Sequence, residues 1–118
     1  MLRKKRFAPL SKVVSWKNKM YKEGNIYTYK ATRFRWQLIR ILKNTDNTVH
    51  VRLYSELYWR QPNINSFKKS NWEIGHLPLD EEALNSWGLI LIGSLPVEED
   101  ELEGYYIWKE DEDAGVFS

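Results

Sequence analysis

Two histidines and many carboxylates are the side chains of this chain that could carry acid–base chemistry or bind a metal. His50 and His76 are the only imidazoles, there is no cysteine, and no Gly-x-Ser-x-Gly motif indicates a nucleophilic serine. A histidine metal site would need both rings and a carboxylate such as Glu73, and the spacing does not indicate one. We therefore expect no metal ion or other cofactor, and we expect each histidine to be a surface or capped residue.

The carboxylates cluster at residues 98–103 and 110–113. Acid–base catalysis on a sugar needs two carboxyl groups held at a fixed separation by a rigid frame. Here they share one terminal helix and a tail, which is typical of a solvated surface. Residues 111–115 lack the glycine position and the twelfth-position glutamate of a calcium loop, and no glycine-rich phosphate loop is present. The sequence predicts a protein that is not an enzyme.

The elements that would position these residues begin with a β-hairpin. Residues 34–43 and 48–59 are rich in β-favouring types, and the Asn and Asp residues at 44–47 form turns readily. Ile39 and Ile41 lie on the opposite side of the first strand from its other apolar residues. We expect either a bulge in this strand or a helix that covers its outer side.

Capping signals and composition predict the remaining elements. Asp80 is a suitable N-cap, with Leu79 and Leu84 spaced as a hydrophobic staple. Residues 61–71 are predicted to be an exposed loop. We assign strands to residues 26–29, 72–77 and 89–95, and helices to residues 11–22, 81–87 and 97–109.

Five short, mostly antiparallel strands with helices at both ends predict an α+β fold. An SH3-like, partly open barrel with N- and C-terminal helices is our first interpretation, and an open α+β sheet with one face covered by helices is the alternative. At 118 residues the chain is predicted to form a single domain, residues 1–118, with a flexible basic tail at residues 1–9 and a flexible acidic tail at residues 110–118.

Charge is segregated along the chain. Residues 1–69 carry a balance of +14 and residues 70–118 a balance of −12, although the net charge is only +2. This asymmetry indicates a charged partner, or attraction between the two halves inside one molecule or a homodimer. Surface ion pairs contribute only about 0–1 kcal/mol each, so stability alone is a weak reason for the segregation.

The acidic half suits a basic protein partner. Its predicted C-terminal helix combines carboxylates, which steer a basic partner, with aromatic residues that can anchor it. A nuclease inhibitor that mimics nucleic-acid charge would have this composition. The candidate partner-binding residues are Glu98, Glu99, Asp100, Glu101, Glu103, Tyr105, Tyr106 and Trp108.

The basic half suggests a different function. Cations interleaved with aromatic residues on one predicted sheet face would suit single-stranded nucleic acid, because bases stack on aromatic rings while cations follow the phosphates. Alternation along the second strand places Leu57 and Trp59 on the other, core-facing side. The acidic helix would cover the basic face if the charges neutralise one another. The residues of this alternative face are Arg33, Arg35, Arg52, Tyr54, Tyr58, Arg60, Lys68 and Lys69.

Targeting signals are not evident. Lys12 interrupts the sequence after the basic cluster at residues 3–6, before a signal-peptide core can form. The longest apolar run, residues 88–95, is far shorter than the roughly 20 residues that cross a bilayer. We expect a cytoplasmic protein with no membrane partner.

Several short stretches carry a resemblance. They are residues 74–79 (Ile-Gly-His-Leu-Pro-Leu), Trp87, residues 101–105 (Glu-Leu-Glu-Gly-Tyr) and residues 107–109 (Ile-Trp-Lys). In these stretches the chain resembles small, uncharacterised bacterial cytosolic proteins that are similar to the immunity proteins of polymorphic toxins. The resemblance implies neutralisation of a toxin, and it implies no catalytic residues. The long basic N-terminal part departs from that pattern.

Overall fold

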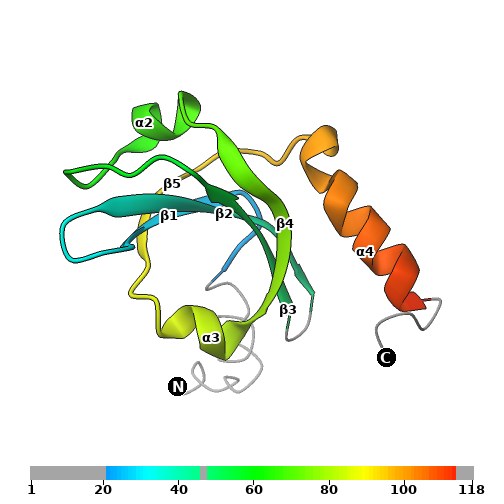
Figure 1. Cartoon of the computed structure of the whole chain (residues 1–118). Helices are drawn as coiled ribbons and strands as arrows, with labels where there is room; N and C mark the ends of the chain where they lie inside the picture. Colours follow the sequence, from blue (N-terminus) through cyan, green and yellow to red (C-terminus); the bar gives the residue numbers. More distant parts are fainter. Residues whose placement is uncertain (1–20, 46–47, 114–118) are drawn as a thin grey trace, which may run out of the picture.

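In the computed structural model of the chain, residues 21–45 and 48–113 are described, and they form an α+β protein around one five-stranded antiparallel sheet (Figure 1). The strand order is β4-β3-β2-β1-β5. The strands are β1 (Asn25–Lys30), β2 (Trp36–Thr45), β3 (Thr48–Tyr54), β4 (Trp72–Asp80) and β5 (Ile90–Ser94). The helices are α2 (Ile64–Lys68), α3 (Glu81–Asn85), the 3₁₀ helix η1 (Glu99–Leu102) and α4 (Glu103–Asp113).

The sheet is open, because β4 and β5 lie at its two edges and do not pair with each other. The predicted antiparallel α+β fold is therefore confirmed, whereas the finer SH3-like barrel stays a prediction. Strand β4 bends strongly along its length (Figure 1), and the β3–β4 register shifts twice. The β2–β3 pairing confirms the predicted hairpin, whose turn residues 46–47 lie outside the described part.

Both faces of the sheet are covered, which explains the apolar residues on both sides of β2. One face, here called the α3 face, packs Ile39, Ile41, Val49 and Val51 against Leu84 of α3. The opposite face, here called the α4 face, has two apolar clusters. Leu38 belongs to the first, with residues of α2 and β5, and Leu42 to the second, with Leu102 and Tyr105 of η1 and α4. A register shift between Ile41 and Lys43 adds the expected bulge, so both predicted explanations hold together.

Several element boundaries differ from the sequence prediction. Strand β3 ends at Tyr54 rather than at residue 59, and α2 occupies part of the predicted loop at residues 61–71. Strand β4 continues through Pro78, which an edge strand tolerates because only one of its sides is paired.

The two ends of the chain also differ from the prediction. Helix α4 extends to Asp113, so residues 110–113 are helical and are not part of a tail. The predicted tail at residues 1–9 and most of the predicted helix at residues 11–22 lie outside the described residues. Tyr21 and Lys22 are not helical.

Gly24, just before β1, packs closely against Leu95, just after β5. Its φ of +92° favours glycine, and a Cβ there would lie 2.7 Å from the Leu95 carbonyl oxygen. The Gly24 N–H donates to the Ile41 carbonyl at 2.9 Å, while its own carbonyl accepts from the Leu95 N–H at 3.0 Å. This junction brings the β5–η1 segment beside β2, where the buried charges of the next section lie.

Candidate functional site

A buried ion-pair network holds η1 against the α4 face. Arg40 of β2 and Arg52 of β3 are directly paired across the two strands, and Glu101 of η1 contacts both. Arg40 Nε donates to Glu101 Oε2 at 2.8 Å, and Arg52 Nη1 lies 3.9 Å from the same oxygen. The Arg40 side chain is only 2% exposed and that of Glu101 only 13%. The pair is therefore largely removed from water, where breaking it costs far more than at a surface.

The other donors of Arg40 are satisfied by backbone carbonyls. They reach the carbonyl oxygens of Gly24 at 3.1 Å, Leu95 at 3.0 Å and Pro96 at 2.8 Å. Burial by itself raises the pKa of the Glu101 carboxyl. Hydrogen bonds from Arg40 and from the Glu98 N–H, with the charges of both arginines, outweigh burial and leave that pKa below its usual value. Glu101 is therefore a structural anion and is not available to a partner.

Both histidines lie under α4 as a contacting pair. His50 Nδ1 is 2.9 Å from His76 Nε2, and His50 Nε2 is 3.1 Å from the Thr45 hydroxyl. The His50 ring also makes edge-to-face contacts with the rings of Tyr105 and Trp108 at centroid distances of 4.7 and 4.6 Å. His50 is fully buried, and the pair occupies the interface between the sheet and α4.

The surroundings of the two rings favour their neutral forms. Burial, the adjacent His76 and the charge of Lys43 together lower the pKa of His50 to about 4, and burial lowers the pKa of His76. The sequence predicted that each histidine is either a surface residue or a capped one, and for His50 the prediction of a surface residue is wrong. Within the described residues no group of three or more His, Asp or Glu side chains could hold a metal ion.

Gly104 lets α4 approach the histidine pair closely. A Cβ at this position would lie 2.6 Å from the His76 Cβ and 3.3 Å from its Cγ. In the sequence, Gly104 is only a poor helix former. The structure shows that glycine at this position permits the close approach of α4 to His76 of β4.

We expect Gly104→Ala to lower the free energy of unfolding by about 1 to 2 kcal/mol, although alanine favours helix by about 1 kcal/mol. The reason is that overpacking against His76 exceeds the gain in helix propensity. Urea denaturation measures the change, and Glu103→Ala, at the exposed neighbouring position, is the matched control with little change. A Gly104→Ala variant as stable as the wild type would contradict this packing.

The outer surface of α4 holds the exposed part of the predicted partner site. Residues at helical spacings of three and four form one solvent-facing stripe. The centre of this stripe is apolar, with Tyr106 47% exposed and Ile107 55% exposed. Exposed carboxylates lie at its two ends and on η1 beside it. We call this surface the α4 stripe; it comprises Glu99, Asp100, Glu103, Tyr106, Ile107 and Glu110.

The structure divides the predicted partner-binding residues into two groups. Glu101 and Tyr105 are buried in the packing of η1 and α4, and Trp108 is half-buried against His50. In the part of the chain described, none of the others forms an ion pair, although Tyr106 donates a hydrogen bond to Glu99 at 3.2 Å. The exposed members are Glu98, Glu99, Asp100, Glu103 and Tyr106.

The alternative basic face is not a continuous surface. Tyr54 is 5% exposed and packs on Phe67 of α2, and Arg52 belongs to the Glu101 network, so both predictions as surface residues are wrong. Tyr58 is half-buried and bonds the backbone of Ser66. Of the remaining five, Arg35 is partly buried, and the others are exposed: Arg33, Arg60, Lys68 and Lys69. Arg33, Arg35 and Arg60 lie at one end of the sheet, whereas Lys68 and Lys69 lie at the end of α2.

Sequence reasoning missed most of the exposed large apolar residues, among them Phe34, Trp59 and Ile107. The prediction that Leu57 and Trp59 face the core is wrong: both are exposed, because the alternation of β3 stops at Tyr54. The Gln61-Pro62-Asn63 segment, whose residue types favour turns and loops, was the available signal that the strand ends before this point.

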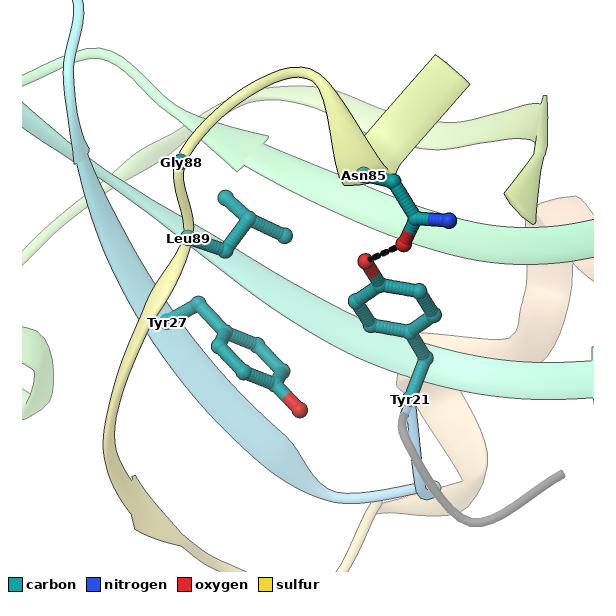
Figure 2. Close-up of a pocket in the computed structure, with 5 residues that line it drawn as sticks. All are labelled: Tyr21, Tyr27, Asn85, Gly88 and Leu89. Carbon is teal, nitrogen blue, oxygen red and sulfur yellow. Dashed lines mark hydrogen bonds between the residues drawn. The ribbon is translucent and has the colours of Figure 1, made fainter. Parts of the chain in front are cut away.

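A separate depression lies between β1 and the segment after α3 (Figure 2). It has a volume of about 410 Å³, and Figure 2 shows Tyr21, Tyr27, Asn85, Gly88 and Leu89 around it. The Tyr21 hydroxyl donates to Asn85 Oδ1, and the Asn25 amide donates to the Tyr27 hydroxyl at 3.2 Å. No charged side chain lines this depression among the described residues, so its walls offer a ligand only apolar contact, tyrosine hydroxyls and the Asn85 amide.

The described residues thus define an α+β protein with an open antiparallel sheet and a helix, α4, whose exposed side carries carboxylates. Comparisons with protein-family models, with curated proteins and with solved structures find no match to this chain. No helix in residues 21–45 and 48–113 combines the length and the apolar character needed to cross a membrane.

Proposed function

We propose that this protein is a non-enzymatic, cytoplasmic binding module that masks a basic protein partner through the α4 stripe, as an immunity protein masks its toxin. The observation that carries the proposal is an exposed tyrosine–isoleucine pair between exposed carboxylates on a helix whose opposite side is fixed to the sheet. Aromatic and aliphatic anchors supply affinity at interfaces, while carboxylates around them steer a basic partner.

Rigidity of the helix supports this role. Leu102, Tyr105 and Trp108 pack inward beside Leu42, and Glu101 joins η1 to Arg40. The partner would meet a preformed surface, which limits the ordering entropy that binding costs. Residues 98–113 contain nine carboxylates and one lysine, Lys109, which pairs with Asp113 at 3.3 Å. The surface is therefore strongly anionic.

The test reverses only exposed charges. A basic partner is first captured from a lysate of the source cells with the tagged wild-type chain. We expect Glu99→Lys/Glu103→Lys to weaken the binding of this captured partner by at least about tenfold while the circular dichroism spectrum stays unchanged. Glu101 is left intact because its loss would disturb the arginine network. Glu73→Lys/Glu82→Lys, two exposed reversals on β4 and α3, is the charge-matched control.

Truncation of the anchors tests the apolar part of the α4 stripe. Tyr106→Ala and Ile107→Ala should each weaken the same partner by about tenfold, measured by calorimetry. A partner bound equally by the wild type and by the α4 stripe variants, or one that is itself acidic, would contradict the proposal.

A further inference from the structure

A second exposed surface lies at the end of the sheet away from α4. The β1–β2 turn, residues 31–35, meets the chain that follows β3, because Trp36 and Tyr58 form a bridge with N–H···O distances of 2.7 and 2.8 Å. In Figure 1 this turn projects on the left of the molecule and α4 lies on the right. The two surfaces are therefore on opposite sides of the protein.

Cations and exposed aromatic rings are paired on this surface. The Arg35 guanidinium lies 3.6 Å from the centroid of the Trp59 ring, and that of Arg33 lies 5.5 Å from the centroid of Phe34. Trp59 is 69% exposed and Phe34 is 63% exposed. These are the two most exposed large apolar side chains among the described residues. We call this surface the basic tip; it comprises Lys30, Arg33, Phe34, Arg35, Trp36, Trp59 and Arg60.

No carboxylate belongs to the two segments that form the basic tip, residues 30–36 and 57–61. The nearest acid along the chain, Glu56, accepts hydrogen bonds from the Asn71 backbone N–H at 3.0 Å. The carboxylates of η1 and α4, which would repel an anionic ligand, lie on the other side of the molecule. The basic tip is thus a local cation surface on a protein of nearly balanced charge.

We propose that the basic tip binds single-stranded nucleic acid. Unpaired bases stack on Phe34 and on the Arg35–Trp59 pair, and the phosphates lie against Lys30, Arg33 and Arg60. Stacking on aromatic rings and guanidinium planes is how proteins hold unpaired bases, and the arginines present planar donors to phosphates.

The stacking residues give the decisive test. A fluorescent oligouridylate of about fifteen nucleotides is titrated with the full chain at low salt, and its anisotropy is recorded. We expect Trp59→Ala and Phe34→Ala each to weaken binding by about tenfold or more. Both side chains are mostly exposed, so the fold should persist, and circular dichroism confirms it. Tyr106→Ala, an exposed aromatic on α4, is the matched control and should bind as the wild type does.

Salt dependence tests the phosphate contacts separately. For a single strand, removing one cation that neutralises a phosphate lowers the slope of log affinity against log salt by about 0.7. Arg33→Ala and Arg60→Ala should each reduce that slope, whereas Lys22→Ala, at an exposed position before β1, should not. Residues 1–20 contain seven further Lys and Arg residues, so weak binding by the wild type alone does not support the proposal.

The proposal is overturned if the oligonucleotide does not bind at low salt, or if Trp59→Ala and Phe34→Ala leave its binding unchanged. Equal competition by a blunt duplex would also overturn it. So would a Trp59-dependent affinity for phosphatidylserine vesicles without a Trp59-dependent affinity for the oligonucleotide. Association of a second copy through its α4 stripe would appear as a Trp59-dependent dimer in sedimentation without nucleic-acid binding, and it would overturn the proposal as well. Since Glu99→Lys/Glu103→Lys tests the α4 stripe and Trp59→Ala tests the basic tip, failure of either function is distinguished from failure of the other.

Discussion

Replacing Arg40 with leucine is expected to lower the free energy of unfolding by about 3 to 5 kcal/mol, because it leaves the Glu101 carboxylate buried with only the more distant Arg52. The same change removes donors from the carbonyls of Leu95 and Pro96, which the guanidinium reaches at 3.0 and 2.8 Å. Urea denaturation monitored by tryptophan fluorescence measures the loss.

A double variant separates the ion pair from the packing. Arg40→Leu/Glu101→Leu removes both charges, so it should be less destabilised than the sum of the two single variants by at least about 1 kcal/mol. Glu103→Ala, two residues away and exposed, should change little. Additive single effects would mean that the Arg40–Glu101 pair does not fix η1 to the sheet.

Acid is expected to destabilise the fold by about 3 kcal/mol between pH 6.5 and pH 4 through His50 alone, with His76 acting in the same direction. The folded pKa of His50, about 4, lies below the unfolded value of 6.5, so within this window the unfolded chain binds a proton that the folded chain does not. Stability is therefore fully present above pH 6.5 and falls as the pH decreases. If both His50 and His76 were protonated, His50 Nδ1 and His76 Nε2, 2.9 Å apart, would both carry hydrogens, and the contact between them would be repulsive.

A pH series of urea denaturation curves tests this expectation. His50→Gln should flatten the dependence between pH 5 and pH 6.5 by about 1 kcal/mol per pH unit, whatever its effect on stability at pH 7. Only two histidines occur in the whole chain, and the Glu101 carboxyl, whose pKa is lowered, titrates below this range. Parallel curves for the wild type and His50→Gln would show that His50 is not held neutral.

Local signals predicted the sheet better than they predicted the site. The Asn- and Asp-containing segment at residues 44–47 specified the hairpin, because turn chemistry acts over a few residues. Asp80 occupies the predicted N-cap position of α3 although its side chain makes no cap hydrogen bond, and Leu79 and Leu84 share one apolar cluster, as the predicted staple requires. Helix α2 was missed although Asn63 and Ser66 form a capping box at its start. The same residue types are also typical of loops, and a five-residue helix shows little apolar periodicity.

Burial of charge could not be predicted, because it depends on contacts between distant segments. Arg40 looks like an ordinary surface arginine in the sequence, but its carboxylate partner comes from 61 residues further along. For the same reason, the sequence did not show which of the eight candidate partner-binding residues are buried and which are exposed. That division depends on how η1 and α4 pack on the sheet. The segregation of charge was visible from the start, whereas the separation of the basic tip from the α4 stripe required the structure.

The distance in sequence between Arg40 and Glu101 has a consequence for synthesis on the ribosome. Five strands can leave the exit tunnel before residue 101, yet until then the guanidinium at the centre of the sheet has no anion to meet. A nascent chain must keep this part of the sheet hydrated until η1 has been made and has left the tunnel. A chain interrupted after β5 would therefore present a sheet whose α4 face lacks η1 and α4 and whose Arg40 lacks the Glu101 carboxylate.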